Sequence, residues 1–326
     1  MNIIKTLTLA AFSLMLSQGV WAQWETDASP NGNMRFSWIH GSLSAKSNKD
    51  VRIQVHRYNE HTYILRQNPA VHWEAPFMYL LFGDESAVLL DAGATSEPEY
   101  FPLRQMVDSV IDRWKTANRV SELTLFVIPL GQDSSQTSAL EQFRNRKNTR
   151  IADDADTRAA LFGSSWPDSG TLSLGGRHLE VIPTPGIDPE AISLFDTWSK
   201  ILLTGNTFYP GRLVIRDHPS YLESLEKLQR IASQSGIASI WGGRIEMSAE
   251  PGLDYMLRSN YRPNERSLQL ESTDLKDALD IVRLINDKQD IQIHDDFIVM
   301  NGVGRGARAY GWPVYIPEMF RKNRTR

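Results

Sequence analysis

Strand patterns come first along this chain, and helical patterns alternate with strands only afterwards. Val51, Ile53 and Val55 alternate with polar residues, which is the period of a strand with one buried face. The apolar runs 77–82 and 87–90 are separated by Gly-Asp-Glu-Ser, a sequence typical of a hairpin turn. This order predicts an α+β fold in which mixed sheets are covered by helices, rather than a wholly parallel doubly wound sheet.

Three helices are expected from apolar residues that recur every three or four positions. The first begins at Leu103 and runs to Trp114. The second is opened by Ser220–Glu223, which has the form of a capping box. The third covers 275–285, with Ser272-Thr273 as its cap. Further strands are expected at 62–66, 123–128, 179–182, 191–195, 201–204 and 237–241.

The composition excludes several classes of function. The chain has 326 residues, 41% of them hydrophobic and 23% charged, which is typical of a soluble globular protein. Its formal charge of -4 gives no broad positive field, so nucleic acid is not an expected partner. The complete lack of cysteine excludes disulfides, thiolate zinc sites and thiol nucleophiles.

The first 22 residues have the layout of a secretory signal peptide. Lys5 precedes an apolar run from Leu7 to Leu16, and the segment closes on Val20-Trp21-Ala22 before Gln23, as at a small-residue cleavage site. The run is shorter than the ~20 apolar residues that a membrane-spanning helix needs, so no membrane span is expected. We therefore expect cleavage after residue 22, a periplasmic or secreted protein, and a polar N-terminal segment over 23–50.

Short sequence blocks appear in a characteristic order between residues 51 and 270. They are HWEAPF at His72–Phe77, LLDAG at Leu89–Gly93, LGGR at Leu174–Arg177, PTPG at Pro183–Gly186, LTGN at Leu203–Asn206 and WGGRIEM at Trp241–Met247. In order and spacing these blocks resemble the metallo-β-lactamase superfamily, and most of all a branch of stand-alone hydrolase-like proteins. The resemblance implies a four-layer αβ/βα sandwich over 51–270 whose strand-end loops form one cleft, followed by a C-terminal appendage, a helix and tail over 271–326.

The same resemblance locates the metal site of the superfamily, and there this sequence departs from the pattern. Members hold one or two metal ions with a histidine-rich block after the strand expected at 123–128, with later histidines and with a bridging aspartate. Here the block Pro129–Gln136 contains no histidine, and the later ligand positions are Ile187, Asn206 and Arg244. Because zinc needs three or four N, S or O donors, we expect neither a bound metal nor any other cofactor.

The residues expected to face the cleft are therefore candidates for ligand binding and not for catalysis. They are His72, Glu74, Asp91, Asp133, Asn206, Arg212, Arg244 and Glu246. A buried charge without a partner is strongly disfavoured, so Arg244 is expected to point into the cleft and to pair with Asp133 or Asp91. The expected partner is a small anionic ligand or another protein.

The favoured interpretation is an exported, non-catalytic binding or regulatory pseudo-hydrolase, and two kinds of alternative stay open. An active hydrolase could use an unusual metal set, for example His72, Asp91 and Asp133. It could also use no metal, with Ser134 or Ser135 completing a triad with His72 and Asp91. Such a triad is defined by geometry and not by composition, so only the arrangement in space can assemble or separate these residues.

Overall fold

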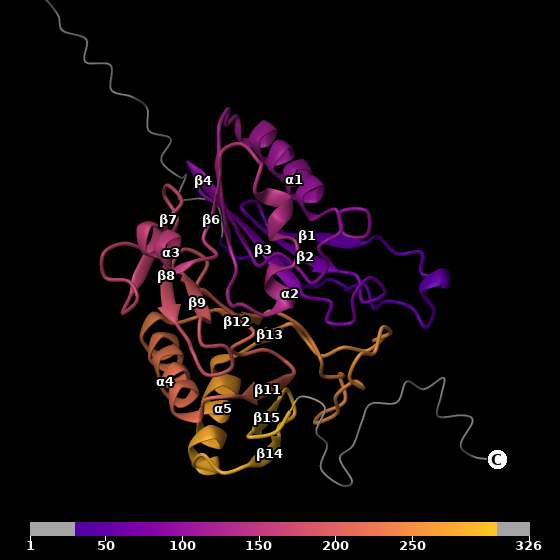
Figure 1. The fold of residues 1–326 in the computed structure, drawn as a ribbon, viewed down its shortest axis with the longest axis vertical. Helices are drawn as coiled ribbons and strands as arrows, with labels where there is room; N and C mark the ends of the chain where they lie inside the picture. Colours follow the sequence, from indigo (N-terminus) through magenta and orange to yellow (C-terminus); the bar gives the residue numbers. More distant parts are fainter. Residues whose placement is uncertain (1–29, 305–326) are drawn as a thin grey trace, which may run out of the picture.

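Two six-stranded sheets face one another at the centre of the structure, a computed structural model that describes residues 30–304 (Figure 1). The first sheet has its strands in chain order: β1 (Ile53–Asn59), β2 (Thr62–Gln67), β3 (Phe77–Phe82), β4 (Ser86–Leu90), β5 (Thr124–Ile128) and β6 (Thr149–Ile151). The expected signal peptide, residues 1–22, and the end of the tail, from 305, lie outside the described residues.

The second sheet has the order β13-β12-β10-β9-β8-β7. Its strands are β7 (Gly170–Ser173), β8 (His178–Pro183), β9 (Ile192–Asp196), β10 (Ile201–Gly205), β12 (Ser239–Gly242) and β13 (Gln269–Leu270). Both sheets are mixed, because β4 pairs parallel with β5 and β10 pairs parallel with β12 while hairpin neighbours are antiparallel. The mixed sheets predicted from the sequence are confirmed.

The buried strand β3 shows how the layers are built. Phe77, Tyr79 and Leu81 belong to the core between the two sheets. Met78 and Leu80 point the other way, into the core under helix α1 (Leu103–Asn118). Successive side chains of a strand alternate between its faces, so a continuously apolar strand must be covered on both sides. The long apolar run seen in the sequence therefore belongs to an inner layer of a sandwich.

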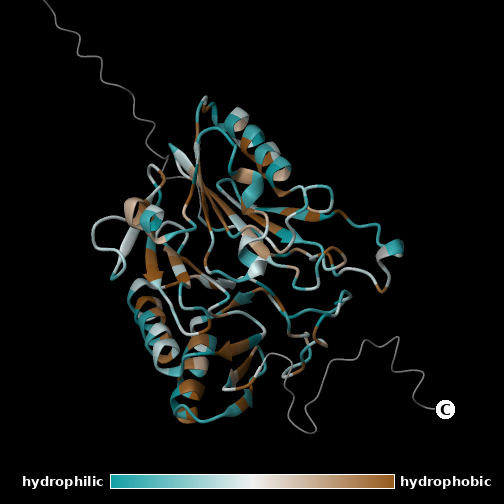
Figure 2. Ribbon diagram, in the orientation of Figure 1, coloured by the Kyte–Doolittle hydropathy of each residue, from teal (hydrophilic) through white to brown (hydrophobic). Residues whose placement is uncertain are grey.

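Two helices, α4 (His218–Ser235) and α5 (Ser272–Ile285), cover the outer face of the second sheet. Beside them lies a three-stranded sheet in the order β11-β15-β14, formed by β11 (Arg212–Ile215), β14 (Asp290–Ile293) and β15 (Ile298–Asn301). Figure 2 shows hydrophobic colour on the inner strands and mixed colour on the helices, as expected for helices with one buried face. The four-layer αβ/βα sandwich expected from the sequence is thus observed.

The helix ends differ from those expected. Helix α4 begins at His218, with two residues between it and the end of β11, and its cap is Asp217, whose side chain accepts from the backbone N–H of Ser220. Ser220 therefore lies inside the first turn and does not open the helix. Helix α5 is capped by Glu271 instead of Ser272-Thr273, in a reciprocal pair with Asp274. In both cases an acidic residue one to three positions earlier satisfies the free backbone N–H groups at the helix start.

Some elements gave too weak a pattern to be expected. They are the short helices α2 (Ser134–Thr137) and α3 (Ala155–Phe162), two 3-10 turns at Ala45–Ser47 and Leu140–Phe143, and the short strands β6, β7, β11, β13, β14 and β15.

The C-terminal segment packs closely on the rest of the structure. Leu275 and Leu279 of α5 share one core with Leu225 of α4, and β15 pairs in parallel with β11. Within residues 30–304, no helix has the length and apolar character to cross a membrane.

Candidate functional site

A cavity of about 840 Å³ opens where strands of both sheets end. Loops after β5, β8, β10, β12 and β15 line it together with β11. Four of the eight candidate residues form part of its wall: Asp133, Asn206, Arg212 and Arg244. The other four, His72, Glu74, Asp91 and Glu246, do not line the cavity, and all but His72 are buried behind it. The strand ends thus bring the expected residues together, four of them on the cavity wall and four beside or behind it.

Arg244 is the central charge of this site. Its side chain is only 1% exposed, and Nη1 donates a hydrogen bond to Glu74 Oε1. Its Nε donates to Asn206 Oδ1 at 3.0 Å, and Nη2 lies 3.9 Å from Asp133 Oδ1. The guanidinium also lies over the Tyr209 ring, 5.3 Å from the ring centre. Arg244 therefore points into the cleft as expected and reaches Asp133, but Glu74 is its main partner.

A chain of hydrogen bonds joins Arg244 to the buried Asp91. Asn206 accepts from Arg244 through Oδ1 and donates through Nδ2 to Gln136 Oε1 at 2.9 Å. Gln136 Nε2 then donates to Asp91 Oδ1 at 3.1 Å. Each amide must present its oxygen to one neighbour and its nitrogen to the other, so the charges at the two ends fix both orientations. The expected direct pair between Arg244 and Asp91 is replaced by this relay.

Asp91 ends strand β4 in a left-handed conformation, with φ of 65°. Besides the bond from Gln136, its Oδ1 accepts from the backbone N–H of Leu130 at 2.7 Å. Burial raises the pKa of Asp91 to about 7, and this effect exceeds the opposing effect of the hydrogen bonds from Leu130 and Gln136 and of the Arg244 charge. Near neutral pH the carboxyl group therefore exists in both protonation states.

Backbone contacts between the two sheets position Glu74 and Asn206. The backbone N–H of Phe77 donates to the carbonyl of Gly243 at 2.8 Å, which holds the 72–77 loop against the end of β12. A Cβ atom on Gly243 would lie 2.9 Å from Asn206 Oδ1, so glycine is needed there for the close approach. Glu74 is 5% exposed in this loop. The Glu-Ala-Pro-Phe block thus delivers the carboxylate that pairs with Arg244.

His72 lies at the edge of the same ion pair. Its Nδ1 is 3.9 Å from Glu74 Oε2 and accepts a hydrogen bond from the Glu74 backbone N–H at 3.3 Å. Burial lowers the pKa of His72, with a smaller opposing contribution from the Glu74 charge. An imidazole with a lowered pKa is neutral at pH 7, so His72 adds no positive charge to the cluster at that pH.

Arg212 and Glu246 form a second ion-pair group. Glu246 Oε2 accepts from the Arg212 backbone N–H at 2.9 Å and lies 3.4 Å from Nη1. Arg212 Nη2 also donates to Asp254 and to the Tyr255 carbonyl. These contacts fasten β11 to the 246–255 segment, so the two residues support the wall of the cavity.

The structure adds cavity residues that the sequence did not single out. Gln136, the link between Asn206 and Asp91, lies in the first turn of α2, which Asp133 caps. Arg216 is exposed on the cavity wall, and within residues 30–304 its side chain makes no hydrogen bond or ion pair. Asp188 Oδ2 accepts a hydrogen bond from the backbone N–H of Gln132 at 2.6 Å. The position of Asp133 at a helix start could have pointed to Gln136, but no local pattern marks Arg216.

The alternative sites considered from the sequence are not assembled. Ser135 Oγ donates to Asp133 at 2.7 Å, and no hydrogen bond between residues 30 and 304 joins Ser134 or Ser135 to His72 or Asp91. Across this part of the chain, no three His, Asp or Glu side chains are grouped so that they could hold a metal ion. The later positions at which the sequence resemblance implied metal ligands are occupied by the apolar Ile187, the neutral Asn206 and the cationic Arg244. The residues present do not fit a divalent cation.

No family model and no curated relative matches the sequence. Among solved structures, a metallo-β-lactamase from Pontibacter korlensis is 14% identical, with 71% of this chain and 99% of that chain covered and a TM-score of 0.48. The metallo-β-lactamase TMB-1 is 12% identical over 60% of this chain and 90% of its own, with a TM-score of 0.43. ETHE1 from Myxococcus xanthus is 18% identical over 52% of this chain and 71% of its own, with a TM-score of 0.38. At these identities the likeness concerns the fold alone.

Proposed function

We propose that this protein is a non-catalytic, hydrolase-like member of the metallo-β-lactamase superfamily that binds a small anionic ligand in the Arg244 cleft. The observation that carries the proposal is the buried guanidinium of Arg244, paired with Glu74 and hydrogen-bonded to Asn206. In the sequence blocks that resemble the superfamily, Arg244 and Asn206 stand at metal-ligand positions. A permanent cation at this point repels a divalent ion in a medium of low dielectric constant.

The proposal of an anionic ligand rests on one cationic group of the cavity wall, Arg216. Arg216 is exposed and lines the cavity. The acidic groups Asp188 and Glu190 of the wall accept hydrogen bonds from the Gln132 backbone N–H and from the Gln132 side chain, at 2.6 and 2.8 Å. An arginine can bind a carboxylate or phosphate through paired hydrogen bonds. A ligand with one such group would use Arg216 as its anchor.

We also propose that the protein acts after export, on the evidence of the signal-like residues 1–22. N-terminal sequencing of the protein recovered from the periplasm or medium is expected to begin at Gln23. A chain recovered from the cytoplasm that still begins at Met1 would contradict this part of the proposal.

The purified wild type is expected to carry no stoichiometric zinc, iron or manganese, and neither Asn206→Asp nor Ile187→His is expected to change this. An aspartate at 206 keeps an acceptor for Arg244 Nε but sets a carboxylate oxygen against Gln136 Oε1. Turning the Gln136 amide sets its oxygen against Asp91, so the Asp91 carboxyl group must then keep its proton. One regained donor also leaves the coordination number too low. Metal analysis after dialysis measures the metal content of each protein, and a screen of ester, lactam and phosphoester substrates measures whether any of them is hydrolysed.

Near one equivalent of tightly bound metal in the wild type would contradict the proposal and favour the active hydrolase that the sequence left open. Metal-dependent turnover in Asn206→Asp or Ile187→His alone would show that the loss rests on a single residue. A matched control is Asp168→Asn, an exposed position whose substitution tests whether metal content responds to any change of one carboxylate.

A further inference from the structure

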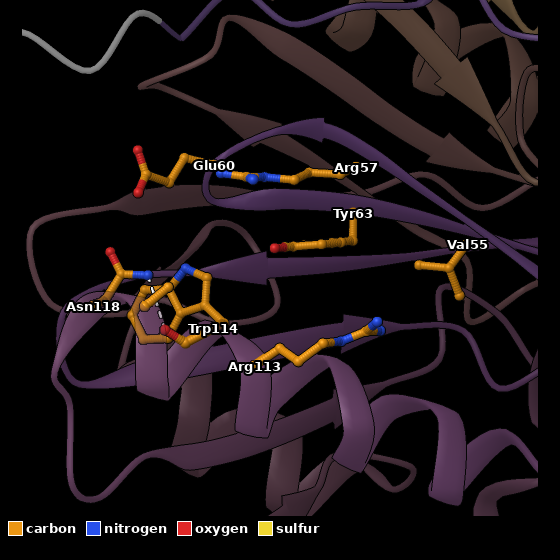
Figure 3. Close-up of a pocket in the computed structure, with 8 residues that line it drawn as sticks. Val55, Arg57, Glu60, Tyr63, Arg113, Trp114 and Asn118 are labelled. Atoms are coloured by element: carbon orange, nitrogen blue, oxygen red, sulfur yellow. Dashed lines mark hydrogen bonds between the residues drawn. The ribbon is translucent and has the colours of Figure 1, made fainter.

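A second cavity, of about 420 Å³, lies between helix α1 and the β1–β2 hairpin, away from the Arg244 cleft (Figure 3). It opens on the helix-covered side of the first sheet, where Val55 packs against the α1 core. Arg57 and Tyr63 are register partners on neighbouring strands, so their side chains stand side by side on one face. A volume of this size is within the ~300–1,000 Å³ typical of small-molecule sites.

The wall of this cavity is rigid and aromatic. Trp114 is buried, stacks on Phe82 with ring centres 4.5 Å apart, and donates through Nε1 to His61 Nδ1 at 3.2 Å. The Tyr63 and Phe82 rings lie at a steep angle to each other, with ring centres 5.7 Å apart. Because these rings are held by one another, they give an apolar surface that needs no rearrangement to receive a ligand.

The polar groups of the cavity are mainly cationic and only partly used. Arg113 donates through Nε to the Ser109 carbonyl at 3.1 Å, which leaves its other guanidinium N–H groups available. Between residues 30 and 304, no hydrogen bond or ion pair engages the Arg57 guanidinium or the Tyr63 hydroxyl. Figure 3 shows the Arg57 guanidinium and the Tyr63 hydroxyl pointing the same way, toward the side of Glu60, whereas the Arg113 guanidinium points the other way, toward the side of Val55. Burial raises the pKa of Tyr63 against the effect of these two arginines, so the phenol remains a neutral donor.

We propose that this cavity binds a small amphipathic anion, an aromatic or aliphatic carboxylate or sulfonate. The anionic group takes hydrogen bonds from Arg57 and from the Tyr63 hydroxyl, which are neighbours on one face, while the apolar body lies against Val55 and Trp114. The Arg113 guanidinium, toward the other end of the cavity, adds positive charge to the site. Glu60 also lines the cavity, which disfavours a second negative charge on the ligand. This site is independent of the Arg244 cleft, and its ligand need not be the same compound.

The probe for this site is 8-anilinonaphthalene-1-sulfonate, and its uncharged counterpart N-phenyl-1-naphthylamine reports apolar contact alone. We expect Arg57→Gln to weaken sulfonate binding by roughly fivefold to tenfold, since it removes a charge-assisted hydrogen bond. Arg113→Gln should weaken it by a smaller factor, since it removes a nearby positive charge only. Binding of the neutral probe should change less than twofold. Ala117→Trp, at an exposed helix position that lines the cavity, should abolish binding of both probes by filling the space.

Arg150→Gln is the matched control, because Arg150 is an exposed arginine on β6 at the other edge of the same sheet. It should leave both affinities unchanged. Equal sulfonate affinity in the wild type and in Arg57→Gln/Arg113→Gln, or undiminished binding in Ala117→Trp, would overturn the proposal. Thermal unfolding of each variant shows whether it is folded.

Discussion

Replacing Arg244 by alanine is expected to lower the free energy of unfolding by about 3–5 kcal/mol, the usual cost of removing one partner of a buried ion pair. The change removes the guanidinium that neutralises Glu74, whose side chain is 6% exposed, and also the donor to Asn206 Oδ1. It also leaves a void beside Tyr209. For a chain of this size the midpoint of thermal unfolding should fall by about 5–8 °C.

A double-mutant cycle separates the ion pair from the void. Glu74→Gln removes the charge that Arg244 neutralises, so Arg244→Ala should cost clearly less in the Glu74→Gln background than in the wild type. Arg150→Ala is the control for loss of an exposed arginine and should change stability by less than about 0.5 kcal/mol. An unchanged unfolding midpoint in Arg244→Ala would mean that the guanidinium does not hold the cleft together.

The second large effect is a loss of stability with rising pH that Asp91→Asn removes. Burial raises the pKa of Asp91 from its ordinary value of 3.8 to about 7. For an acid whose pKa is raised on folding, the folded state holds its proton more tightly, so stability is fully present below pH 3.8 and falls as pH rises through about 7. The stability lost over that window is on the order of 4 kcal/mol.

The measurement is the free energy of unfolding of the wild type and of Asp91→Asn between pH 4 and pH 8. The wild type should lose stability relative to the variant across this window, since asparagine keeps the shape of the side chain but carries no charge. Asparagine also tolerates the φ of 65° at this position better than most residues. Parallel curves for the two proteins would contradict the raised pKa, and Asp168→Asn, exposed on the surface, should run parallel to the wild type.

The residue patterns of the sequence predicted mixed sheets covered by helices, and the four-layer sandwich was expected from the resemblance of the sequence blocks. The continuous apolar run of β3 can be buried on both faces only inside a sandwich, and the periodicity of α1 requires it to lie on a sheet. The sequence also placed Asp133, Asn206 and Arg244 at strand ends, and these three residues meet in one cleft. Hydrophobic periodicity is a local property, so it can be read without knowledge of the distant contacts.

The tertiary structure alone decided which groups satisfy one another. Arg244 is paired mainly with Glu74, 170 positions earlier in the chain, and of the two expected alternatives, Asp133 or Asp91, only Asp133 lies within salt-bridge reach. The relay through Gln136 and the cavity beside Tyr63 likewise depend on which loops and faces the two sheets bring together. The sequence pattern around a charged side chain does not indicate which residue will pair with it. Its partner is set by burial and by the few donors and acceptors within reach, and these exist only once the strands have paired.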